Sequence, residues 1–180
     1  MLSIVIPECE LFDESNMEFI YVKRTTLQLE HSLVSVSKWE SKWCKPFLGK
    51  QARTTEESID YIRCMTLTQN VDPNVYLAIT DANMKKVDEY INLPMTAAIF
   101  SESGDKKISN EFITSETIYH WMISMQIPFE CQKWHLNRLI ALVRFCEVKN
   151  APPKKVSAKD TIARYKALNE ARKKKWGTRG

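Results

Sequence analysis

Two tryptophans, a proline and a second helix start lie close together in residues 29–65, which read LEHSLVSVSKWESKWCKPFLGKQARTTEESIDYIRCM. Val36, Trp39 and Trp43 recur at spacings of three and four, which places them on one face of a helix. The polar residues between them are expected on the solvent side of that helix: Lys38, Glu40, Ser41 and Lys42. This segment therefore predicts a first amphipathic helix with an aromatic face.

The same segment also predicts where this helix ends and the next one begins. Pro46 has no amide hydrogen to donate, so the helix is expected to end near Cys44. Thr54 or Thr55 can cap a second helix, because two glutamates follow in the first turn, where the helix dipole favours carboxylates. Its apolar stripe is Ile59, Ile62, Cys64 and Met65. Two such helices form a hairpin that can bury both indoles.

Composition limits the classes to which the protein can belong. A chain of 180 residues, 44% hydrophobic and 27% charged, predicts a soluble domain with a sizeable core. Four glycines and no long apolar run argue against a membrane span, a phosphate-binding loop or a flexible linker. The start MLSIVIPECE does not resemble a signal peptide. Five widely separated cysteines cannot all pair within one chain, which favours a reducing cytosol.

Charge is unevenly distributed along the chain. Residues 149–180 contain 11 lysines and arginines and two acidic residues, a net charge of +9, whereas the other 148 residues have a net charge of −5. We therefore expect a globular body over residues 1–150 and a basic helical tail over residues 151–180.

The body is expected to have an α+β fold. Residues 2–6 and 17–22 predict a strand pair, and the alternation in residues 25–30 predicts a third strand of a small antiparallel sheet. The remainder is expected to be mainly helical. The other predicted elements are a short element that Asp72 caps, with Pro73 in its first turn, a helix to about residue 125 that Ser115 caps, helices at 81–92, 128–148 and 158–175, a strand at 97–100 and a loop at 101–110.

Four tryptophans are predicted to anchor the core: Trp39, Trp43, Trp121 and Trp134. Apolar residues at helical spacing usually belong to a core. Met122 and Met125 accompany these aromatics, and methionine-rich surfaces also suit a protein that binds varied helices.

No cofactor, metal site or catalytic residue is predicted. Cys131 and His135 are one helical turn apart, but Cys146 would lie about 16 Å from His135 by helical rise, too far to share an ion. The cysteines occur in apolar stripes without a glycine-rich turn, so they do not resemble nucleophiles. His31 and His120 are expected at helix borders.

The basic tail predicts a binding helix. Its stripe of Ile162, Tyr165 and Leu168 is thin, and its other faces are basic. The tail could be a solvated helix, an arm for nucleic acid or a segment that folds on a protein partner. The candidate partner-binding residues are Ile162, Tyr165, Leu168, Arg172, Lys173, Lys174, Lys175 and Trp176.

Two regions resemble a known family, the tail assembly chaperones of long-tailed, siphovirus-type bacteriophages. The first contains SLVSVSKWESKWCKPFLGK and TTEESIDYIRCMTL, and the second contains IPFECQKWHLNRLIALVRFCEVKNAPPKK and ALNEARKKKWGTRG. Together they span residues 32–67 and 127–180, about half of the chain, and match in packing and turn residues.

The resemblance implies a non-enzymatic factor of virion morphogenesis. Such a protein binds the long, helical tape measure protein, prevents its aggregation and recruits the major tail protein for tube assembly. It acts in the host cell cytoplasm and is absent from the mature virion, and many members also have a longer, frameshifted form. Self-association is compatible with the opposite charges of body and tail. The alternative is a cytosolic phage nucleic-acid-binding or regulatory protein that acts through the tail, and no membrane partner is expected.

Overall fold

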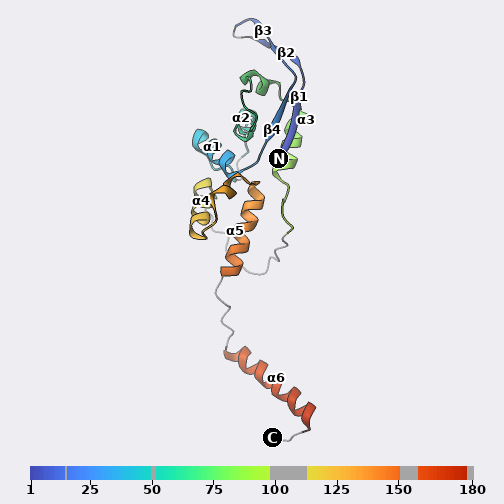
Figure 1. The fold of residues 1–180 in the computed structure, drawn as a ribbon, viewed down its shortest axis with the longest axis vertical. Helices are drawn as coiled ribbons and strands as arrows, with labels where there is room; N and C mark the ends of the chain where they lie inside the picture. The colour runs from blue at the N-terminus through green and yellow to red at the C-terminus, as the bar shows by residue number, and fades with distance from the viewer. Residues whose placement is uncertain (15, 50–51, 98–112, 151–157, 178–180) are drawn as a thin grey trace. The chain divides into compact units, whose positions relative to one another are not determined.

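The computed structural model describes residues 1–14, 16–49, 52–97, 113–150 and 158–177. It has an α+β architecture, as predicted, and divides into two compact units, Met1–Val148 and Lys149–Gly180 (Figure 1). No helix among the described residues combines the length and the apolar character needed to cross a bilayer.

The N-terminal strands form a nested antiparallel ribbon (Figure 1). Strand β1 (Leu2–Ile6) pairs with β4 (Thr25–Leu29), and β2 (Cys9–Asp13) pairs with β3 (Glu18–Val22). The expected pairing of residues 2–6 with 17–22 is therefore wrong, and β2 was not predicted. The observed register places Ile4 and Ile6 of β1 on the same buried face as Leu27 and Leu29 of β4, which explains the pairing.

The predicted helix hairpin is present as α1 (Leu33–Trp43) and α2 (Thr55–Met65). Ser32 caps α1, and Thr54 caps α2 in a box with Glu57. Helix α1 ends as predicted, since Cys44 has a left-handed backbone with φ of 50° and its amide donates to the Glu40 carbonyl.

Glu40 is buried, contrary to its expected position on the solvent side of α1. Its Oε1 accepts a hydrogen bond from the Phe47 amide at 2.7 Å, and its Oε2 accepts one from the Ser115 amide at 2.7 Å. The carboxylate thereby connects α1 to the following turn and to the first residue of α4 (Ser115–Ser124). A carboxylate is stable at this buried position because two amides, one of them at a helix N-terminus, compensate its lost hydration.

The remaining helices agree with the predicted pattern in part. A short 3-10 helix, η1 (Pro73–Ala78), follows its Asp72 cap, and α3 (Asp81–Ile91) ends at Asn92 as expected. Ser115, expected as a cap, is instead the first helical residue of α4. Apart from residue 97, the strand expected at 97–100 and the loop at 101–110 lie outside the described residues.

The long helix expected at residues 128–148 is interrupted. The structure has a 3-10 helix, η2 (Phe129–Lys133), followed by α5 (Leu136–Asn150). Trp134 between them is extended, His135 forms a bridge to Ser32, and the Leu136 amide donates to the His31 carbonyl at 2.7 Å. This long-range pairing replaces a helical turn, which is why local periodicity did not reveal the break.

The core of the Met1–Val148 unit lies between one face of the ribbon and the helices. Its largest fully buried side chains are Trp39, Ile4, Ile6, Leu27, Leu29, Leu33, Ile62, Met65, Ile118, Met122, Leu136 and Leu139. They come from β1, β4 and helices α1, α2, α4 and α5, so one cluster joins segments that are far apart in the sequence.

Candidate partner-binding site

The predicted tail helix is present as α6 (Ala158–Trp176), 19 residues long. Its large apolar side chains are 45 to 76% exposed, the most exposed being Trp176. At 100° per residue, Ile162, Tyr165, Leu168 and Trp176 fall within about a third of the helix circumference. Figure 1 shows α6 as a single uninterrupted helix. The structure therefore groups the four apolar candidates on one face, which we call the α6 apolar face.

Cations lie around the α6 apolar face. Residues 162–176 contain six basic side chains and one acidic side chain, a net charge of +5. Arg172 falls within the apolar face on the helical wheel, and Lys175 lies at its edge. All the described side chains of α6 are exposed. Such a helix can bind an acidic amphipathic surface through contact area and charge together.

The four predicted core tryptophans do not share one environment. Trp39 is 1% exposed, and its Nε1 donates to the Glu57 carbonyl of α2 at 2.8 Å. Trp43, Trp121 and Trp134 are partly buried and pack against the edge of the core. Trp43 also donates to the Asp60 carboxylate at 2.9 Å. Among the four, only Trp39 fills the centre of the hairpin.

Ion pairs connect α1 and its following turn to α2. The Lys42 ammonium donates to Asp60, and the Lys45 ammonium donates to Glu57. The hydrogen bond from Lys45, followed by that from the Thr54 amide, lowers the pKa of Glu57. Burial raises the pKa of Asp60, but the hydrogen bonds from Lys42 and Trp43 outweigh it, so that the pKa is lowered overall. These carboxylates connect the two helices of the hairpin, and each of their four oxygens accepts a hydrogen bond.

A buried cluster of polar aromatic residues lies beneath the hairpin. His31, expected at a helix border, is 1% exposed, and its Nδ1 shares a hydrogen bond with the Tyr61 hydroxyl. Its ring centroid is 5.0 Å from that of His135. Burial, followed by the charge of His135, lowers the pKa of His31 to about 3, and burial raises the pKa of Tyr61. Both groups are therefore neutral at pH 7, and both side chains are buried.

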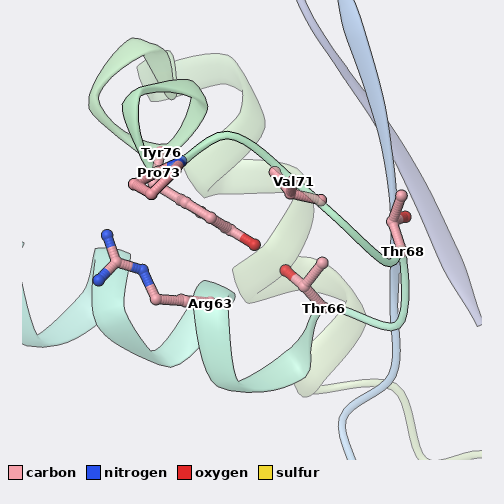
Figure 2. Close-up of a pocket in the computed structure, with 6 residues that line it drawn as sticks. All are labelled: Arg63, Thr66, Thr68, Val71, Pro73 and Tyr76. Atoms are coloured by element: carbon pink, nitrogen blue, oxygen red, sulfur yellow. The ribbon is translucent and has the colours of Figure 1, made fainter.

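A surface pocket of about 240 Å³ lies between α2 and η1 (Figure 2). Its lining residues are Arg63, Thr66, Thr68, Val71, Pro73 and Tyr76. The Arg63 guanidinium lies 4.9 Å from the Tyr76 ring centroid, and the Thr66 hydroxyl donates to the Ile62 carbonyl. The pocket is below the usual size of small-molecule sites, about 300 Å³ or more, and its lining contains no carboxylate, histidine, lysine or cysteine.

Cys131 and His135, the two candidate ligands nearest in sequence, lie in or beside different elements. Cys131 lies in η2 and His135 precedes α5, so the two do not share the helix on which they were expected. Within the described part of the chain, no three histidine, cysteine or acidic side chains are grouped to hold a metal ion.

Sequence reasoning missed an exposed aromatic face on the β2–β3 pair. Phe12, Phe19 and Tyr21 lie on it and are 48 to 73% exposed. The alternation of Phe19 and Tyr21 with Ile20 and Val22 was a usable signal, because period-two alternation implies two faces. When both faces of a short strand carry large apolar or aromatic residues, one of the two faces is expected to be exposed.

Comparison of the chain with known protein families, with curated proteins and with solved structures finds no match.

Proposed function

We propose that the protein is a non-enzymatic bacteriophage tail assembly chaperone that binds the tape measure protein through α6 and promotes assembly of the tail tube. The observation that carries the proposal is the α6 apolar face, an exposed apolar stripe flanked by cations. The sequence resemblance supplies the identity of the client. The protein would act in the host cytoplasm and be absent from the mature virion.

The dimensions of α6 suit a long helical client. Nineteen residues span about 28 Å, which allows contact with several turns of a second helix. An exposed apolar face gains free energy when a client helix covers it, and the flanking cations select clients with acidic residues beside their apolar stripe. The net charge of +5 on residues 162–176 also keeps free copies soluble.

A second candidate is a phage nucleic-acid-binding or regulatory protein. The run of four consecutive cations at residues 172–175 favours it, since such a run neutralises phosphates without reading base sequence. Phosphate binding requires the charge alone, whereas a client helix requires the apolar residues as well. The two functions can therefore be separated by mutation.

The decisive experiment is co-expression with a tape measure protein. Truncation after Asn150 is expected to leave a folded body that no longer keeps the client soluble. The double substitution Ile162→Ser and Leu168→Ser is expected to reduce client solubility while leaving retention on DNA at low salt unchanged. A matched control is Ala163→Ser with Ala167→Ser, which makes two serine substitutions on the opposite side of the same helix.

The opposite pattern would overturn the proposal. If the Ile162→Ser, Leu168→Ser variant protects the client as well as the wild type, the apolar face is not used. If neutralising residues 172–175 then abolishes both function and salt-sensitive DNA binding, the nucleic-acid function is correct.

A further inference from the structure

The β2–β3 pair presents a sheet face that the described residues of the Met1–Val148 unit leave exposed. The register pairs Phe12 with Phe19 and Glu10 with Tyr21, so these four side chains share one face. The rings of Phe12 and Phe19 are in contact, with centroids 5.1 Å apart. Adjacent exposed aromatics of this kind form a contiguous apolar patch, which is typical of an interaction surface. We call these four residues of the β2–β3 pair, together with Glu8, the hairpin face. It is a different surface from the helix hairpin of α1 and α2.

The hairpin face is acidic as well as aromatic. Residues 8–22 contain five acidic side chains and no lysine or arginine. Glu8 and Glu10 flank the aromatic rings, and the Tyr21 hydroxyl donates to the Glu8 carboxylate at 3.3 Å. The nearest cations along the chain are Lys23 and Arg24, which follow β3. A surface that matches the hairpin face must therefore offer apolar side chains with positive charge beside them.

The α6 apolar face has both properties. It offers Ile162, Tyr165, Leu168 and Trp176, all exposed, with Arg172 among them. We propose that the hairpin face binds the α6 apolar face of a second copy of this chain. Apolar contact would cover the exposed rings on both sides, and the opposite charges would set the orientation and speed the encounter.

The proposed contact joins two different surfaces, so it is heterologous. Each copy would then keep one free hairpin face and one free α6, and addition of copies need not close into a ring. The paired strands are five residues long, about 17 Å, so α6 can cover them with one face. An interface of this size belongs to the small, transient class, so we expect association at micromolar or higher concentrations.

Charge exchange tests the proposal on the purified full-length chain. One variant carries Glu8→Lys and Glu10→Lys, and the other carries Arg172→Glu and Lys175→Glu. The wild type at low salt is expected to show a weight-average mass in sedimentation that rises with concentration to at least about twice that of one chain. Each variant alone should remain at the mass of one chain, and an equimolar mixture of the two should recover the concentration-dependent rise.

Controls separate this result from a general charge effect. Lys85→Glu with Lys86→Glu on α3 changes the net charge as much as the α6 variant does and should associate like the wild type. Far-UV circular dichroism checks folding. Phe19→Ser replaces the variant with Glu8→Lys and Glu10→Lys if that variant misfolds. Added salt should reduce the wild-type mass towards that of one chain.

Three results would overturn the proposal. One is a wild type that stays at the mass of one chain at every concentration, which is also the result expected if α6 docks within its own chain. Another is a hairpin variant that associates like the wild type. The last is a mixture that does not recover association. None of these measurements contains a client, so their failure leaves the proposed function to be decided by the co-expression experiment.

Discussion

Helices α1 and α6 both carry tryptophan and lysine, yet a tryptophan of α1 is buried and the tryptophan of α6 is exposed. Trp39 in α1 is buried, and its indole donates to the carbonyl of Glu57, whereas Trp176 at the end of α6 is 76% exposed. The difference lies in the neighbours, because α2 supplies both an apolar stripe and hydrogen-bond acceptors for α1. A tryptophan at helical spacing is thus a core residue only when another element offers its ring and its N–H a partner.

The largest effect on stability is expected at the centre of the helix hairpin formed by α1 and α2. Trp39→Ala should lower the free energy of unfolding by about 3 to 5 kcal/mol, because it removes a fully buried indole and leaves a cavity. Trp43→Ala is the comparison, and its expected loss is smaller because Trp43 is only partly buried. Chemical denaturation of the two variants would measure both losses. Equal losses would show that the edge and the centre of the hairpin contribute alike.

Glu40 tests whether the polar contacts of α1 matter as much as its apolar face. Glu40→Ala should destabilise the protein by about 2 to 4 kcal/mol, since two buried amides lose their acceptor. Glu40→Gln should cost less, because one amide oxygen remains available. The midpoint of urea denaturation reports both values. A near-zero change for the alanine variant would mean that water replaces the carboxylate.

The pH dependence of stability isolates His31. Its folded pKa of about 3 lies below the ordinary value of 6.5, so the unfolded state binds more protons between these values. Stability should therefore fall as pH falls from 6.5 towards 3, with His31 accounting for about 2 kcal/mol at pH 5.

The control for this effect is His31→Phe, which should have a shallower dependence between pH 7 and 5. Some slope should remain, because burial also lowers the pKa of His135. Denaturation at a series of pH values gives both slopes, and identical slopes would show that His31 is hydrated in the folded protein.

The smallest effect on stability is expected in α6. Trp176→Ala should change the free energy of unfolding by less than about 0.5 kcal/mol, as is usual for an exposed side chain. Thermal unfolding followed by circular dichroism would measure it. A loss as large as that of Trp39→Ala would remove the contrast between the two helices.

The parts of the fold that follow from local signals were predictable. The caps Thr54 and Asp72 and the end of α1 at Cys44 agree with the predictions, because capping and helix termination depend on neighbouring residues. The exposed stripe of α6 was also predicted from its spacing. Its partner was not, since the sequence of one chain does not state what covers an exposed face.

The wrong predictions arise where contacts between residues far apart in the sequence determine the burial or the pairing. Glu40 lies at the edge of the apolar face on a helical wheel, and its burial depends on the amide of Ser115, 75 residues away. The pairing of β1 with β4 likewise depends on which register buries Ile4 with Leu27. Local periodicity does not contain either fact. The hairpin face was missed because its aromatics resemble core residues until the pairing is known.

The thiols of this protein have a use that follows from their placement. All five are free, and they occur in or beside five different elements: Cys9 in β2, Cys44 after α1, Cys64 in α2, Cys131 in η2 and Cys146 in α5. Burial raises the pKa of Cys64 and of Cys131, so both should be alkylated slowly, whereas exposed Cys44 should react first. Alkylation followed by peptide mass spectrometry would then give an opening rate for each region of the native fold without any engineered probe.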